Sequence, residues 1–146
     1  MQPVIYFDSF MWNVSVPVGK GAPRTGHEDV FYIQWYYKMA AEHVLTPPDR
    51  KAVYKNVQTN GSCTGLDSDP LVQSIMTHQR FLAHPIIDGR VSVATGTGKL
   101  QDKAFFVYRI GARIAHMHPE LWPRLDKIPG RPGPVADAVR RTIPKL

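Results

Sequence analysis

The sequence predicts a mainly α fold: a small three-helix bundle with an N-terminal β-arm or hairpin and an extended, Pro-rich C-terminal tail. Three segments, near 28–45, 69–84 and 99–118, carry apolar residues at helical spacing. A glycine-rich turn over residues 85–98 separates the last two segments, and its Asp-Gly pair favours a sharp reversal of the chain. Together these observations predict helices that bury their apolar faces against one another.

We expect one domain with a segment attached at each end. A chain of 146 residues is long enough for one hydrophobic core. Residues 1–16 are rich in β-branched and aromatic side chains around an Asp-Ser turn, which predicts an arm or hairpin. Residues 17–118 form the helical domain. Residues 119–146 form a basic, Pro-rich tail with a short terminal helix near 135–142. No internal repeat is evident.

The first expected helix has the clearest start. Acidic Glu28 and Asp29 follow His27 and favour the positive end of the helix dipole. One apolar stripe comprises Val30, Ile33, Tyr37, Ala40, Ala41 and Val44. A second comprises Phe31, Trp35 and Met39. A helix that is apolar on two faces lies at the centre of a domain or in an interface. Pro47 and Pro48 are expected to end it.

The other two helices complete the expected core. Asp69 or Ser68 is suited to cap the second helix, with Pro70 in its first turn. Residues 52–57, before it, alternate between apolar and polar as in a short strand. In the third helix we expect Gly111 to be a point of close packing. The predicted core residues are Ile33, Tyr37, Ile75, Leu82, Ala104 and Tyr108.

Charge is unevenly distributed. The net charge is +6, and residues 99–146 carry ten basic and four acidic side chains, whereas residues 1–98 are balanced. The excess indicates either an anionic partner for the tail or a basic tail that is simply solvated. Nucleic acid is not favoured as that partner, because the aromatic cluster at 31–37 lies in the neutral part of the chain. The apolar runs are too short for a membrane span.

No pattern predicts catalysis, a metal site or a cofactor. Residues 96–99, Gly-Thr-Gly-Lys, depart from the phosphate-loop motif at two required positions. His116 and His118 are two apart on an expected helix, so they point in different directions and do not form a metal pair. Cys63 is the one cysteine, and we expect it to be a small buried side chain.

Three short motifs carry a resemblance to a known family. Residues 28–34 contain Glu-Asp-Val and Ile-Gln, residues 60–65 read Asn-Gly-Ser-Cys-Thr-Gly, and residues 88–91 read Asp-Gly-Arg-Val. With the preceding glycine loop at 18–23, this series resembles the peptidoglycan-binding-like helical domain of phage, cell-wall hydrolase and type VI secretion proteins. The match covers about residues 14–100.

The resemblance implies a ligand at Trp35, Tyr36, Asp88 and Arg90, and a structural role for the glutamine of each matched helix, which is expected to bond loop backbone. The sequence departs from the family at two of its pairs. Asparagine-glycine at 60–61 replaces aspartate-glycine, and histidine-glutamine at 78–79 replaces phenylalanine-glutamine.

Two functions are compatible with this match. The first is a non-catalytic peptidoglycan-binding-like module, a component of a phage particle or secretion apparatus that acts at the bacterial cell wall. The second is a purely structural assembly subunit, a virion or injection-machine protein that has lost wall binding. In both cases we expect an oligomeric setting in which residues 1–16 and 119–146 dock on other protein subunits.

The beginning of the chain has no basic region and no small-residue cleavage site. We therefore expect synthesis in the cytoplasm without a signal peptide. Action would then take place in a virion or secretion assembly, with the periplasm or cell wall as its location.

Overall fold

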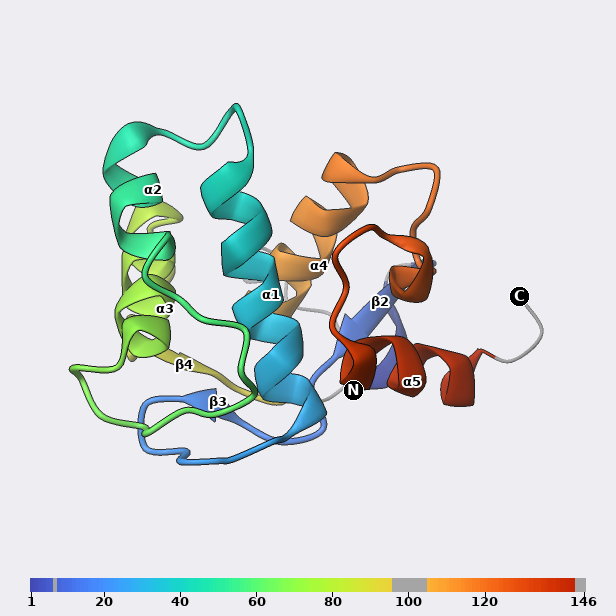
Figure 1. Cartoon of the computed structure of the whole chain (residues 1–146), viewed down its shortest axis with the longest axis horizontal. Helices are drawn as coiled ribbons and strands as arrows, with labels where there is room; N and C mark the ends of the chain where they lie inside the picture. Colours follow the sequence, from blue (N-terminus) through green and yellow to red (C-terminus); the bar gives the residue numbers. More distant parts are fainter. Residues whose placement is uncertain (7, 96–104, 144–146) are drawn as a thin grey trace.

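The computed structural model describes residues 1–6, 8–95 and 105–143, and within them five α-helices, one 3-10 helix and two small antiparallel sheets (Figure 1). The elements in chain order are β1 (Gln2–Tyr6), β2 (Ser9–Asn13), β3 (Val18–Gly19), α1 (Glu28–Glu42), α2 (Pro48–Tyr54), α3 (Pro70–Phe81), β4 (Arg90–Val91), α4 (Phe106–Met117), η1 (Leu125–Lys127) and α5 (Gly133–Thr142). The fold is a mixed α/β domain, so the prediction of a mainly α three-helix bundle with an extended tail is wrong.

Two helices account for most of this difference. Helix α2 begins at Pro48, where the sequence pattern indicated a break followed by a strand-like piece. Proline is well suited to the first turn of a helix, because its missing N–H would have no partner there. Helix α5 lies in the Pro-rich tail and buries Val135, Ala138 and Val139, in contact with α1 and η1. The short terminal helix expected near 135–142 is therefore present, but it packs on the domain, whereas the sequence predicts an extended tail.

Four predicted helices are confirmed as α1, α3, α4 and α5. The side chain of His27 caps α1 by accepting a hydrogen bond from the backbone N–H of Asp29 at 3.1 Å. Asp69 caps α3 by accepting one from the backbone N–H of Leu71 at 2.8 Å. The predicted start of the third helix, near residue 99, lies outside the described residues.

Helix α1 is central to the core. In Figure 1 it runs between α2 and α3 on one side and α4, the β1–β2 hairpin and α5 on the other. Of the predicted core residues, Ile33, Tyr37, Ile75 and Tyr108 are buried and Leu82 is partly buried. Ala104 lies outside the described residues. The expected close packing at Gly111 is confirmed, because an added Cβ would lie 3.3 Å from the Trp122 ring.

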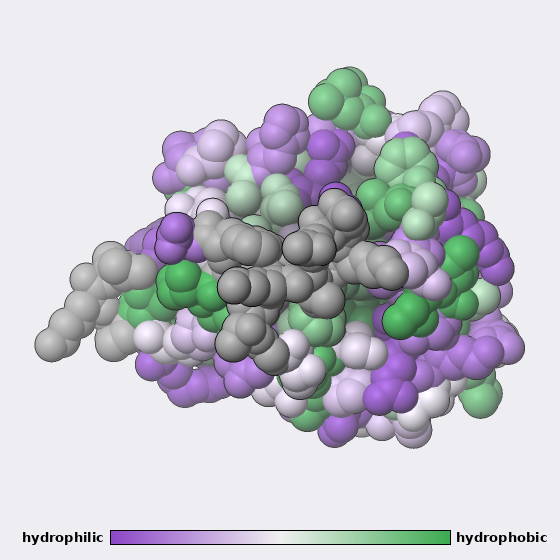
Figure 2. All heavy atoms as spheres, turned by 180° about the vertical axis from the view of Figure 1, so that it is seen from behind, coloured by the Kyte–Doolittle hydropathy of each residue, from purple (hydrophilic) through white to green (hydrophobic). Residues whose placement is uncertain are grey.

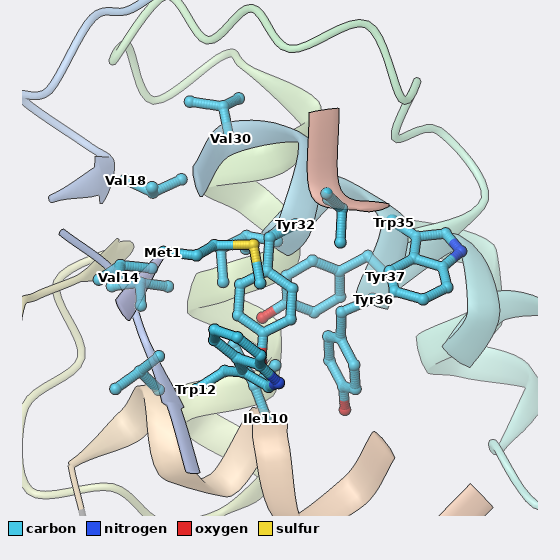
Figure 3. Close-up of a cluster of buried hydrophobic side chains, with 14 of the residues drawn as sticks. Met1, Trp12, Val14, Val18, Val30, Tyr32, Trp35, Tyr36, Tyr37 and Ile110 are labelled. Atoms are coloured by element: carbon cyan, nitrogen blue, oxygen red, sulfur yellow. The ribbon is translucent and has the colours of Figure 1, made fainter. Parts of the chain in front are cut away.

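The N-terminal segment is a hairpin that packs on this core. Strands β1 and β2 pair antiparallel, and Figure 3 shows Trp12 of β2 in one cluster with Tyr32 of α1 and Ile110 of α4. The indole Nε1 of Trp12 donates to the carbonyl oxygen of Pro123 at 2.9 Å. The hairpin therefore contacts its own domain through its largest side chain.

A buried carboxylate anchors the chain that follows the hairpin. Oδ2 of Asp29 accepts hydrogen bonds from the backbone N–H and the hydroxyl of Ser15 at 2.7 and 2.8 Å, and from the backbone N–H of Val16 at 3.0 Å. At the other end of the chain, Arg141 of α5 donates to Glu28 at 2.6 Å. Both end segments thus attach to the start of α1.

Both end segments thus pack on their own domain. Docking of residues 1–16 and 119–146 on other subunits stays a prediction. Among the described residues, the exposed large apolar side chains are Ile5, Val44, Leu45, Leu66, Phe81, Ile86 and Ile87. They come from several separate segments, and Figure 2 shows hydrophobic patches interspersed with hydrophilic ones on the rear face.

Two glutamines hold two turns in the same way. Oε1 of Gln34 accepts from the backbone N–H groups of Asn60 at 3.1 Å and Gly61 at 2.8 Å. Oε1 of Gln79 accepts from those of Asp88 at 3.1 Å and Gly89 at 2.9 Å. The expected bonding of loop backbone by both glutamines is therefore confirmed.

The side-chain amides of the same glutamines complete each clamp. Nε2 of Gln34 donates to Oδ1 of Asn60 and to the carbonyl of Ser62 at 3.1 and 2.9 Å. Nε2 of Gln79 donates to Oδ1 of Asp88 and to the carbonyl of Arg90 at 3.0 and 3.1 Å. The structure thus contains a repeated unit that the sequence did not reveal.

We expect Gln79→Ala to lower the free energy of unfolding by about 2–3 kcal/mol, because two backbone N–H groups lose their acceptor. Gln73→Ala, at an exposed position of α3, is the control and should change it by less than about 0.5 kcal/mol. Urea denaturation measures both. Equal midpoints for the two variants would contradict the importance of the clamp.

Gly89→Val should destabilise the fold more than Gly130→Val. Both glycines have positive φ, +70° and +77°, so both variants carry the backbone strain of a β-branched residue. A Cβ at Gly89 would also lie 2.9 Å from Met76 and 3.0 Å from Val72, whereas nothing lies within 4 Å at Gly130. The expected difference is about 1–3 kcal/mol, measured by thermal unfolding. Similar melting temperatures for the two variants would contradict the close packing of this turn.

Candidate ligand-binding site

The structure separates the four residues that the sequence analysis proposed as ligand contacts. Trp35 is 2% exposed and belongs to the core. Asp88 and Arg90 lie in the turn that Gln79 holds. There Oδ1 of Asp88 accepts hydrogen bonds from the backbone N–H of Arg90 and from Nε2 of Gln79, both at 3.0 Å. Tyr36 is the one of the four that lines the groove described next. The four therefore do not form one site.

A groove of about 510 Å³ lies between α1, α2, α3 and α4. Its floor is aromatic. The Tyr36 and His78 rings are stacked with centroids 5.6 Å apart, and Tyr37 lies against Tyr54 at 4.9 Å. The hydroxyl of Tyr37 and Nδ1 of His78 are hydrogen bonded at 3.2 Å. These contacts join α1, α2 and α3 in one aromatic cluster, of which Tyr36, Tyr54 and His78 line the groove.

Arginines form the walls of this groove. Arg50, on α2, places its guanidinium carbon 3.3 Å from the centre of the Phe81 ring, a cation–π contact that orients it. Arg109 and Arg113, on α4, are four residues apart and so share one face of the helix. Exposed Leu45 adds an apolar segment to the rim.

The charge of these guanidiniums is not balanced by the groove itself. Among the described residues, no Asp or Glu lines the groove, and Arg50, Arg109 and Arg113 form no ion pair. A guanidinium carries its charge at any physiological pH and presents a planar set of donors. The walls are therefore suited to an anionic, planar group such as a carboxylate.

The floor of the groove stays uncharged at neutral pH. Burial, together with the charges of Arg50 and Arg113, lowers the pKa of His78 to about 3. Burial also raises the pKa of Tyr54 to about 12 and that of Tyr36 above its ordinary value. Cationic walls over a neutral aromatic floor favour a ligand that is anionic and partly apolar.

A second and larger pocket, of about 750 Å³, is less suitable. It lies beside the turn at residues 60–61. Its lining includes Gln34, Asn60 and Asp69, whose polar groups are already bonded within the fold. Oδ2 of Asp69, for example, accepts from the backbone N–H and the hydroxyl of Thr64. Cys63 also lines this pocket but is buried, as predicted, and burial raises the pKa of its thiol.

The rest of the described chain adds no other candidate centre. In the residues that the structure describes, no three His, Cys, Asp or Glu side chains are arranged to hold a metal ion. None of the helices described combines the length and the apolar character needed to cross a bilayer. No family model, curated protein or solved structure matches the chain.

Sequence reasoning missed the groove because its cations come from distant segments. The basic excess after residue 98 indicates a partner for the tail, whereas Arg109 and Arg113 belong to α4. Their spacing of four residues was the available signal, since it places both on one helix face. Nothing in the sequence indicated that Arg50 would lie on the opposite wall.

The buried His78 makes stability depend on pH. Its pKa in the fold, about 3, lies below the ordinary 6.5, so an unfolded chain binds a proton in this range that the folded chain does not. The free energy of unfolding therefore depends on the state of His78. The stability that this residue allows is fully present above pH 6.5 and is lost as the pH falls towards 3. Between pH 7.5 and 4.5 it amounts to about 2–3 kcal/mol.

We therefore expect His78→Gln to lose less stability than the parent between pH 7.5 and 4.5. Glutamine removes the titrating group while keeping a polar partner for Tyr37. His116→Gln, at an exposed position of the same groove, serves as control and should follow the parent. Urea midpoints at the two pH values give the measurement. Parallel curves for His78→Gln and the parent would show that His78 is not held neutral.

Proposed function

We propose that this chain is a non-catalytic peptidoglycan-binding module, a component of a phage particle or secretion apparatus that acts at the bacterial cell wall. The observation that carries the proposal is the groove in which Arg50, Arg109 and Arg113 surround an uncharged aromatic floor. Peptidoglycan presents carboxylates on its peptide stems together with apolar methyl and ring surfaces. Guanidiniums bind carboxylates, and aromatic rings pack on apolar methyl and ring surfaces.

Binding suits this groove better than turnover. His78 is buried, neutral and hydrogen bonded to Tyr37, so it is a packing group rather than a general acid or base. Its neighbours on the floor are tyrosines whose pKa values are raised by burial. These groups shape a surface and offer no proton donor matched to neutral pH.

The competing proposal is a structural assembly subunit without wall binding. Exposed Leu45 and Phe81 beside the groove favour it, because apolar side chains at a rim suit a protein partner. In that case the arginines would bind acidic side chains of a neighbouring subunit. Retention on isolated cell wall separates the two functions.

We expect the purified chain to sediment with sacculi stripped of other anionic polymers, and to be released by soluble muropeptides. Arg50→Gln combined with Arg113→Gln should weaken retention at least tenfold, since each charged hydrogen bond contributes about 1.5–3 kcal/mol. The control combines Arg80→Gln with Arg131→Gln, which removes two exposed charges that do not line the groove. Thermal unfolding checks that both double variants are folded.

A parent chain that stays in the supernatant with sacculi would exclude wall binding and favour the assembly subunit. Equal retention of the two double variants would place binding outside the groove.

A further inference from the structure

We propose that the groove distinguishes peptide stems by their charge, binding stems with free carboxylates and rejecting stems in which these groups are amidated. The inference rests on the proposed function and specifies the ligand of the same site. It follows from the number of guanidiniums, their placement on two walls, and the absence of acidic groups in the lining among the described residues.

The two walls present their cations from different helices. Arg50 comes from α2, and its stacking on Phe81 limits the directions in which its N–H groups point. Arg109 and Arg113 come from one face of α4. Because a single carboxylate satisfies one guanidinium edge, a ligand that uses both walls needs two anionic groups on one short framework.

The field of these cations reaches the floor between the walls. Arg50 and Arg113 both lower the pKa of His78, and both also act on Tyr36, so the two guanidiniums converge on the same rings. The floor rings remain uncharged and cannot offset them. Asp49 also acts on Tyr54, but it does not line the groove, and no described residue of the lining is a carboxylate, so the potential where a ligand would lie is positive.

Peptidoglycan stems match this arrangement in one chemical form. A free-acid stem carries a carboxylate on its γ-linked glutamate and others on the following residues. Amidation converts a carboxylate to a carboxamide of nearly the same size, which removes the charge and substitutes N–H donors for an acceptor oxygen. The carboxamide N–H groups would then face the N–H groups of arginine. An amidated stem therefore loses one of the two acceptor oxygens that a guanidinium can bond, and places a donor against a donor there.

The selectivity follows from charge rather than shape. The two stem forms have nearly the same volume, so both would fit the space above Tyr36 and His78. The free-acid form gains charge-assisted hydrogen bonds at Arg50 and at α4, and each such group changes affinity by about tenfold or more. A stem with two amidated positions should bind about a hundredfold more weakly.

The test is titration calorimetry of the full chain with three forms of one disaccharide-tripeptide: free acid, singly amidated and doubly amidated. We expect affinity to fall about tenfold with each amidation. The double variant Arg50→Gln with Arg113→Gln should bind all three forms more weakly and with a smaller difference between them, because only Arg109 remains of the three guanidiniums. The control, Arg80→Gln with Arg131→Gln, should keep the parent's order.

Three other outcomes of the calorimetry would overturn the inference. Equal binding of all three forms, with sacculus retention intact, would overturn charge selectivity and leave wall binding standing. No binding of any form, with no retention on sacculi, would overturn the proposed function as well. Equally tight binding of an unrelated acidic peptide without sugar would show that the groove is a general docking site for anionic chains, and would also overturn the inference.

Discussion

The clamps made by Gln34 and Gln79 are the constraint on which the rest of the fold depends. Each glutamine fixes a sharp turn to a helix by bonding two backbone N–H groups that would otherwise be unpaired. Tyr36 follows the first glutamine by two residues and His78 directly precedes the second. The bonds that hold the turns therefore also set the rotation of α1 and α3, which stacks those two rings in the groove floor.

Burial then divides the groove into a neutral part and a charged part. Rings from α1, α2 and α3 exclude water from one another, and this shifts the pKa values of His78 and Tyr54 towards their uncharged forms. The arginines line the walls of the groove, where the Arg50 guanidinium stacks on the Phe81 ring and Arg109 is exposed. Since the fold supplies them with no acidic partner among its described residues, their electrostatic attraction remains available to a ligand.

Local patterns were sufficient for part of this structure. The spacing around Ile33 and Ile75, the cap at Asp69 and the turn at Gly89 predicted α1, α3 and a left-handed glycine, because each signal is contained within a few residues. Helix α2 and the packing of the C-terminal segment on the domain were not predictable in the same way. Proline at 47–48 is compatible with an end or a start, and α5 is stabilised by packing on α1 that no local pattern contains.

The candidate site shows why polar residues in a motif are a poor guide to a ligand. Asp88 looks available in the sequence, yet its carboxylate already accepts bonds from Gln79 and Arg90, and so it serves the turn. A binding site needs the opposite: polar groups for which the fold provides orientation but no partner. Arg50 meets that condition, since an aromatic ring orients it and no described carboxylate pairs with it. The hydrogen bonds of the fold therefore separate side chains that complete the structure, such as Asp88, from Arg50, which is oriented but has no carboxylate partner among the described residues.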